Sequence, residues 1–201
     1  MSVPLHRREL SQYEYVRAFL ELYAEAEYRI AETSKRRKRW IGDPLMSQLN
    51  EIYDDIMTMS DEYYKYGINL KSNSEKALLV INKLVNLQKP LFSFWNISDY
   101  DERRMNILAS KVNEVIKQLA NMGGIDNSDL RYSVFIIDKE KSEELEFLKN
   151  MKLLHKFIHS KVTSMPVKYA NTKGKLIMDL SDEALLHVFE ANKKYPTTLE
   201  M

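Results

Sequence analysis

The sequence is dominated by long stretches in which apolar residues recur at spacings of three and four, the period of an amphipathic helix. A clear example is the series Leu45, Leu49, Ile52, Ile56, Met59 and Tyr63. Glycine and proline, the residues that most often end helices, number only five each in 201 residues, below the roughly 7% and 5% of average proteins. Long helices are therefore expected, and a turn-rich β fold is not.

Signals at the ends of four such stretches predict where the helices begin and end. Ser11, Asp43 and Ser98 are suited to cap helices, because their side-chain oxygens can accept hydrogen bonds from the first turn. Ser72 with Glu75 matches a capping box, and Pro90 should kink or end that helix early because it has no backbone N–H. The expected helices run from Ser11 to about Ser34, from Asp43 to the stop at Gly67, from Ser72 to the region of Trp95, and from Ser98 to the glycines at 123–124.

Short links between long helices make consecutive helices antiparallel. We therefore expect an all-α fold in which residues 1–124 form an up-down-up-down four-helix bundle. Each helix should turn its apolar stripe inward. In the first helix that stripe is Val16, Phe19, Leu20, Tyr23, Ala26 and Ile30.

The pattern changes after Gly124, and residues 125–201 are expected to form a mostly helical C-terminal appendage. The segment "LRYSVFII" at 130–137 is typical of an extended or strand-like stretch, and "ANTKGK" at 170–175 of a loop. A short helix should begin at Ser181 and end before Pro196. A longer helix should run from Ser142 to about Ser164, with an inward face of Leu145, Leu148, Met151, Leu154, Ile158 and Val162.

The absence of cysteine excludes disulfides, thiolate chemistry and cysteine-ligated metal sites. The longest aliphatic run, "ALLVI" at 77–81, is far below the ~20 residues that span a bilayer. No apolar stretch of signal-peptide length stands at the start of the sequence. We expect a cytoplasmic protein without a membrane partner.

Charge is strongly segregated along the chain, although the formal net charge is only +1. The stretch from Trp40 to Tyr64 contains six acidic residues and no lysine or arginine, whereas Phe147 to Met178 contains seven lysines and no acid. The folded protein should therefore present separate acidic and basic surfaces.

Five consecutive cations precede Trp40 in the segment "KRRKRW". Lysine and arginine neutralise phosphates, and an aromatic neighbour offers a face on which a base can stack. Alternatively, the cations complement the C-terminal dipole of the first helix while Trp40 closes the end of the bundle. Because five cations exceed what a dipole needs, we predict a nucleic-acid-binding surface made of Arg7, Arg8, Lys35, Arg36, Arg37, Lys38, Arg39 and Trp40.

A second basic face is predicted on the helix that ends near Ser164, where four lysines share one broad side. It either docks on the acidic second helix of the same or another subunit, or contacts phosphates as an auxiliary surface. Its members are Lys149, Lys152, Lys156 and Lys161.

His155 and His159 are four residues apart, a spacing that suits zinc on one side of a helix. A third ligand is missing nearby, and only His187 or a distant acid could supply it, so we expect no metal site and no cofactor. The acids Glu51, Asp54, Asp55 and Asp61 lie off the apolar stripe of their helix, which favours a solvated or protein-docking face.

No glycine-rich phosphate loop, nucleophile elbow or paired serine–histidine motif is present, so we expect the protein not to be an enzyme. The enzymatic alternative is a metal-dependent hydrolase built on His155 and His159.

The opening "MSVPLHRRELSQYEYV" and the segment "RRKRWIGDPLMSQLNEIYDDI" resemble a known family over residues 1–124. It comprises the small four-helix-bundle proteins associated with reverse transcriptases, including the accessory variability determinant (Avd) of diversity-generating retroelements. The resemblance implies a homo-oligomeric accessory protein of a phage or mobile element, without catalysis, that binds nucleic acid and a reverse transcriptase. The alternative is a phage or mobile-element interaction module, such as an inhibitor of a host defence complex, that acts through residues 125–201.

Overall fold

The computed structural model describes residues 13–33, 38–66, 70–94, 99–128, 132–134 and 146–194. The predicted all-α class is confirmed, since helices dominate these residues and none of them lies in a strand. Contacts divide the chain into two compact units, described separately here. One holds Met1–Gln88 with Ile107–Val134, and the other Lys89–Asn106 with Phe135–Met201. The division into residues 1–124 and 125–201 stays a prediction.

In the first unit, α2 (Glu14–Ala31) packs antiparallel to α4 (Asp43–Tyr66). Near the start of α2, the Tyr15 hydroxyl lies 2.9 Å from Oγ of Ser60, and further along the helix the Tyr23 hydroxyl donates to Oδ1 of Asn50 at 2.7 Å. Leu20, predicted to face inward, is 42% exposed, because the buried stripe of α2 passes through Leu22 instead. Ser11 lies outside the described residues.

Five residues of the inward stripe predicted for α4 are confirmed as buried: Leu45, Leu49, Ile52, Ile56 and Met59. The side chain of Tyr63, the sixth predicted member, is outside the described part. The helix ends at Tyr66, as predicted, although Gly67 is outside the described residues.

The predicted N-cap role of Asp43 is wrong, because a π-helical segment, η1 (Lys38–Gly42), runs directly into α4 and carries the helix back to Lys38. A Cβ added at Gly42 would lie 2.6 Å from Cγ2 of Ile30. Glycine therefore lets η1 pass close to the end of α2.

The third predicted helix is divided in two. It begins at Leu70 as α5 (Leu70–Asn86), so Ser72 lies inside the helix and is not its cap. α5 lies beside α4, where Lys76 pairs with Glu62. It ends early, as Pro90 predicted, because Pro90 cannot donate a hydrogen bond to the carbonyl of Asn86. After the break at Leu87 comes α6 (Gln88–Phe94).

The predicted glycine stop of the fourth helix, α7 (Asp99–Gly123), is confirmed. Gly124 has a positive φ of 62°, and its N–H donates to Asn121 O while that of Ile125 donates to Ala120 O. These two bonds make a Schellman end, in which glycine adopts the left-handed conformation without a steric penalty. Ser98 lies outside the described residues.

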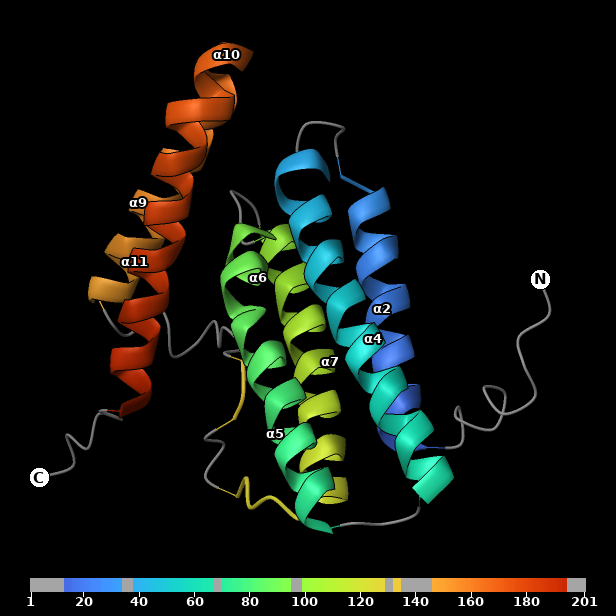
Figure 1. The fold of residues 1–201 in the computed structure, drawn as a ribbon. Helices are drawn as coiled ribbons and strands as arrows, with labels where there is room; N and C mark the ends of the chain where they lie inside the picture. Colours follow the sequence, from blue (N-terminus) through green and yellow to red (C-terminus); the bar gives the residue numbers. More distant parts are fainter. Residues whose placement is uncertain are drawn as a thin grey trace, which may run out of the picture. The chain divides into compact units, whose positions relative to one another are not determined.

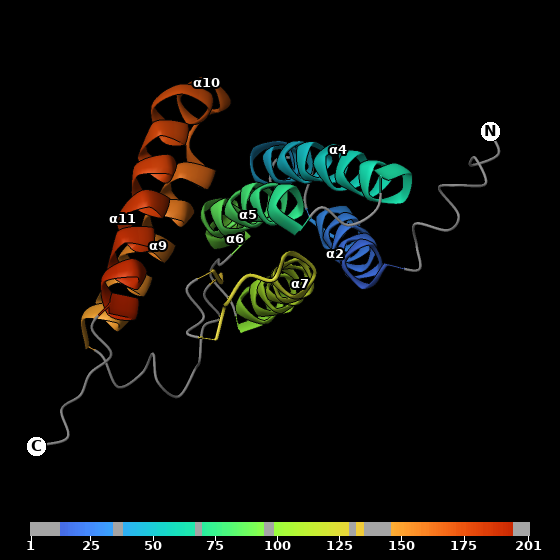
Figure 2. The same cartoon turned by 60° about the horizontal axis from the view of Figure 1, so that its bottom comes forward.

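Contacts in the first unit place α7 beside two other helices. Lys111 pairs with Glu21 of α2, and a Cβ on Gly123 would lie 3.0 Å from that of Ala77 in α5. Figures 1 and 2 show α2, α4, α5 and α7 running side by side.

The backbone after α7 is tied to this helix by one side chain. Asn113 Nδ2 donates to the carbonyl of Val134 at 2.9 Å, and the Val134 N–H donates to Asn113 Oδ1 at 2.7 Å. Residues 132–134 therefore do not form a strand, because their hydrogen bonds go to a helix side chain and a turn. The rest of the predicted 130–137 strand lies outside the described residues.

In the second unit, α9 (Glu146–Ser164) and α11 (Lys175–Lys194) form an antiparallel pair (Figure 1). α9 ends at Ser164, as predicted; its predicted first residues, 142–145, are outside the described part. The short α10 (Val167–Tyr169) and the π-helical η2 (Ala170–Gly174) lead without a break into α11.

Two predictions for this segment are wrong: residues 170–175 are not a loop, and the last helix does not begin at Ser181. Ala170 and Gly174, four residues apart, are both buried. A Cβ on Gly174 would lie 2.8 Å from Cγ1 of Val162. These small residues let the chain stay helical while it passes close to α9.

The predicted inward face of α9 is also partly wrong. Leu154 is 50% exposed, whereas His155, His159 and Val162 are buried. The buried side of α9 is therefore the histidine side, because that side faces α11.

Candidate functional site

The described part of the basic–aromatic segment is exposed. Lys38 and Arg39 lie in η1, and neither has a hydrogen bond or ion pair within the described residues. Arg7, Arg8, Lys35, Arg36 and Arg37 lie outside that part, as does the side chain of Trp40.

The helix dipole raises the positive potential at Lys38 and Arg39. Because η1 and α4 are continuous, both cations lie on the N-terminal side of a long helix. That end of a helix carries about +0.5 elementary charge. In the alternative interpretation of the sequence, these cations complement the C-terminal dipole of the first helix. That helix, α2, ends at Ala31, so Lys38 and Arg39 lie outside its last turn and the interpretation does not hold for these two residues.

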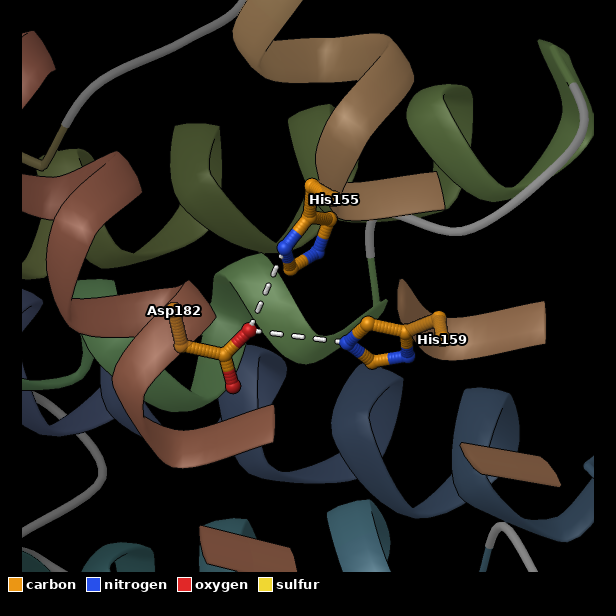
Figure 3. Close-up of side chains that lie close together, drawn as sticks. All are labelled: His155, His159 and Asp182. Carbon is orange, nitrogen blue, oxygen red and sulfur yellow. Dashed lines mark ion pairs between the residues drawn. The ribbon is translucent and has the colours of Figure 1, made fainter. Parts of the chain in front are cut away.

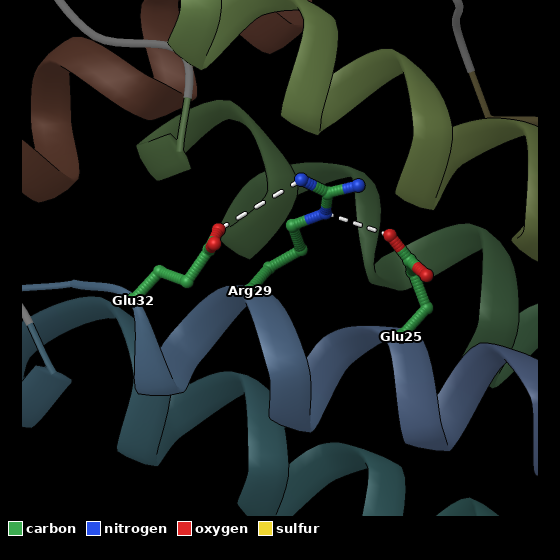
Figure 4. A network of polar contacts seen from close by, with 3 residues as sticks. All are labelled: Glu25, Arg29 and Glu32. Atoms are coloured by element: carbon green, nitrogen blue, oxygen red, sulfur yellow. Dashed lines mark hydrogen bonds and ion pairs between the residues drawn. The ribbon is translucent and has the colours of Figure 1, made fainter.

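Arg29, in the last turn of α2, shows the contrasting case (Figure 4). Its Nε donates to Oε1 of Glu25 at 2.7 Å, and its Nη1 lies 3.8 Å from Oε2 of Glu32. Burial alone would lower the pKa of Arg29, but the hydrogen bond to Glu25 and the charges of both glutamates outweigh it and raise the pKa. This cation is matched within its own helix and is not available to a partner.

The lysines of α9 are placed on a mixed basic and apolar surface. Lys149 and Lys161 are exposed and Lys156 is half-buried, while the side chain of Lys152 is outside the described part. The Lys161 ammonium lies 5.3 Å from the centre of the Phe157 ring, a cation–π distance. Phe157 itself is 59% exposed.

The acidic face of α4 is partly used within the first unit. Asp55 pairs with Lys83, and Glu62 with Lys76, both on α5. Glu51 and Asp54 are exposed, and Asp61 is half-buried. The acidic helix therefore docks in part on a lysine-bearing neighbour of its own chain.

A compact polar cluster lies between α9 and α11 (Figure 3). His155 and His159 come from α9 and Asp182 from α11, with exposed fractions of only 1%, 0% and 3%. Oδ1 of Asp182 lies 3.6 Å from Nδ1 of His155 and 3.5 Å from Nε2 of His159. The two imidazole rings are 4.4 Å apart at their centres. This carboxylate oxygen therefore faces both imidazoles.

Ser181, the residue before Asp182, belongs to the same cluster. Its Oγ lies 3.0 Å from Nδ1 of His155 and the residue is 8% exposed. Two histidine nitrogens, a carboxylate and a hydroxyl thus converge in one buried layer.

The two histidines were recognisable from their spacing, but Asp182 was not. It is 23 residues beyond His159 in the sequence and was expected at the start of a short helix. The signal that points to it is a polar Ser181–Asp182 pair between Met178 and Leu185, which are both buried on the same side of α11. His187, the other ligand considered from the sequence, is exposed.

Chemically, such a cluster can hold a proton or a divalent cation. The ligand atoms of His155, His159 and Asp182 all lie within 4.8 Å of one another, and no other such trio occurs among the described residues.

No described helix is both long enough and apolar enough to cross a membrane. Comparison with known proteins found no matching family model, curated protein or solved structure.

Proposed function

We propose that this chain is a non-enzymatic accessory protein of a phage or mobile element that binds nucleic acid and a reverse-transcriptase-like partner. The nucleic-acid surface comprises Lys35–Trp40 with Arg7 and Arg8. The observation that carries this proposal is the exposure of Lys38 and Arg39 on the N-terminal side of a long helix, with no ion pair to another residue in the described part of the chain.

The proposed scaffold is an up-down-up-down four-helix bundle that forms homo-oligomers. Supporting contacts link α2 to α4, α4 to α5, α5 to α7 and α7 to α2. Each contact joins helices that run in opposite directions, which is the pattern of such a bundle. The resemblance of residues 1–124 to the reverse-transcriptase accessory family agrees with this arrangement.

The proposed contact with phosphates has a physical basis in both charge and geometry. The dipole of α4 favours an anion on the N-terminal side of that helix. Lys38 and Arg39, two flexible and exposed cations, lie on this side. Each phosphate neutralised on a single strand contributes about −0.7 to the slope of log affinity against log salt.

The test measures binding of single-stranded RNA and DNA oligonucleotides at several salt concentrations by fluorescence anisotropy. The double variant Lys38→Ala/Arg39→Ala should bind more weakly, with a salt slope shallower by about 1.4, because two contacts are lost. The matched control, Arg17→Ala/Lys117→Ala, removes the same charge from exposed helical positions and should keep the slope. Equal slopes for all three proteins would contradict the proposed surface.

A second candidate, a protein-interaction module acting through its C-terminal segment, is favoured by one observation. Most of the exposed large apolar side chains of the described residues lie on α9, α10 and α11, whereas exposed apolar residues on monomers are normally scattered singly. They are Leu153, Leu154, Phe157, Val167, Tyr169, Leu176, Ile177 and Leu180.

This candidate is tested by the mass of the protein in solution, from light scattering. If the apolar surface mediates self-association, Leu153→Glu/Phe157→Glu should reduce the mass. The control Leu79→Glu changes an equally exposed leucine on α5 and should not. If the oligomer stays intact in both variants, this apolar surface is not its interface.

A further inference from the structure

The pairing of α9 with α11 buries polar residues and exposes apolar ones. Leu154 and Phe157 of α9 are 50% and 59% exposed, and Leu180 of α11 is 56% exposed. The buried layer between the helices contains His155, His159, Ser181 and Asp182 beside the apolar residues Val162, Met178 and Leu185. A buried aspartate with exposed leucines on the same helices departs from the usual distribution.

Burying a carboxylate is costly unless it is matched by charge or by a metal ion. The distances from Asp182 Oδ1 to the two histidine nitrogens, 3.5 and 3.6 Å, are longer than the ~3.2 Å limit of ordinary hydrogen bonds. These pairs are therefore ion pairs without a short hydrogen bond, and they match the carboxylate charge only when a histidine is protonated. A bound metal ion would match that charge with neutral histidines.

The two distances from Asp182 Oδ1 to the histidine nitrogens are close to the separation between two ligand atoms that bind the same metal ion. Zinc binds imidazole nitrogen and carboxylate oxygen at 2.0–2.2 Å, so two ligands of a tetrahedral site lie about 3.3 Å apart. Adjacent ligands of an octahedral site at 2.0–2.1 Å lie about 2.9 Å apart. Separations of 3.5 and 3.6 Å are nearer to the tetrahedral edge.

We infer that His155, His159 and Asp182 bind one divalent transition-metal ion, Zn²⁺, in the layer between α9 and α11. Two imidazoles and one carboxylate are a zinc donor set. The Ser181 hydroxyl lies 3.0 Å from Nδ1 of His155, beside this trio.

The burial of the cluster indicates a structural ion. With exposed fractions of 1%, 0% and 3%, the three ligands leave little room for a substrate to approach. The ligands come from both helices, so the ion would cross-link α9 to α11 and add to the apolar contacts of Val162, Met178 and Leu185. Metal binding to such a site adds to folding stability, because the unfolded chain has no preformed site.

The experiment uses the full chain without an affinity tag, dialysed against a chelator and then titrated with Zn²⁺ in a calorimeter. We expect one ion per chain, together with a rise of the thermal unfolding temperature when zinc is added. Asp182→Asn keeps the size of the side chain and removes the anionic ligand. It should weaken zinc binding by at least ~100-fold, more than the 10–100-fold seen for partners outside the coordination shell.

His187→Gln is the matched control, because His187 is an exposed histidine on the same helix, α11. This variant should bind zinc as the wild type does. Unchanged zinc affinity in Asp182→Asn, or its loss in His187→Gln, would overturn the assignment.

One part of the zinc experiment uses only the wild-type protein and needs no variant. Chelator-treated wild type that neither takes up Zn²⁺ nor gains thermal stability overturns the site, even where Asp182→Asn does not fold. Co²⁺ in place of Zn²⁺ should give the intense visible absorption of tetrahedral cobalt, whereas the weak octahedral spectrum would contradict the proposed geometry.

Discussion

At the scale of single residues, close helix contacts depend on the absence of a side chain. Gly174 is the sharpest case in the second unit, since a Cβ there would meet Cγ1 of Val162 at 2.8 Å. Real Cβ atoms do not approach a neighbour so closely, so one of the two helices must shift to admit it. Gly42 plays the same part toward Ile30 in the first unit.

Gly174→Ala should therefore destabilise the protein by about 1–3 kcal/mol, the usual cost of overpacking a filled interior. The measurement is the free energy of unfolding in urea. Val162→Ala removes the clashing methyl, so the double variant should lose less stability than the two single changes added together. If the stability losses of the two single variants simply add in the double variant, the alanine at position 174 does not contact the side chain of Val162.

At the scale of the element, α2 owes part of its stability to charges arranged along one side. Arg29 sits between Glu25 and Glu32, at spacings of four and three residues, near the negative end of the helix dipole (Figure 4). Partly exposed pairs of this kind each contribute about 0.3–0.5 kcal/mol. A cation in the last turn adds a comparable amount through the dipole.

Arg29→Ala should accordingly reduce the free energy of unfolding by about 1 kcal/mol in low salt, and by less in high salt, where exposed charges are screened. Glu25→Gln/Glu32→Gln is the informative control, because it removes both ion pairs but keeps the cation at the helix end. It should cost less than Arg29→Ala. If Arg29→Ala lost the same free energy of unfolding at every salt concentration, an electrostatic origin of its effect would be excluded.

At the scale of the whole molecule, the two proposed sites use different helices and different units. Lys38 and Arg39 belong to η1 in the first unit, whereas the histidine–aspartate cluster belongs to α9 and α11 in the second. Sites that share no partner residues usually behave additively.

The two activities should therefore be separable by mutation. Lys38→Ala/Arg39→Ala is expected to leave the zinc affinity unchanged, and Asp182→Asn is expected to leave the salt slope of nucleic-acid binding unchanged. Both are measured by the titrations described above. Loss of both activities in either variant would show that the units are coupled.

Local signals in the sequence were sufficient wherever a hydrogen bond or a hydrophobic stripe is determined by nearby residues. The apolar stripe of α4, the early end of α5 before Pro90 and the Schellman end of α7 at Gly124 are of this kind. Each depends on a period of 3.6 residues, a missing N–H or a positive φ, and none needs a distant partner.

Predictions failed where tertiary packing outweighs local preference. Helix caps expected at Asp43 and Ser72 are not formed, because η1 continues into α4 and α5 already begins at Leu70. The loop expected at residues 170–175 is helical, since Ala170 and Gly174 let it approach α9. Burial of Leu154 was expected from periodicity alone, but α11 faces the histidine side of α9.

The amino-acid sequence by itself thus determined the helical class of this protein, the C-terminal ends of α4, α7 and α9 and the cationic segment before Trp40, because these depend on near neighbours and composition. Only the tertiary structure decided that Asp182 meets His155 and His159, and that Lys38 and Arg39 lie on the N-terminal side of α4. Both facts depend on how helices continue and pair over many residues, which no local pattern encodes.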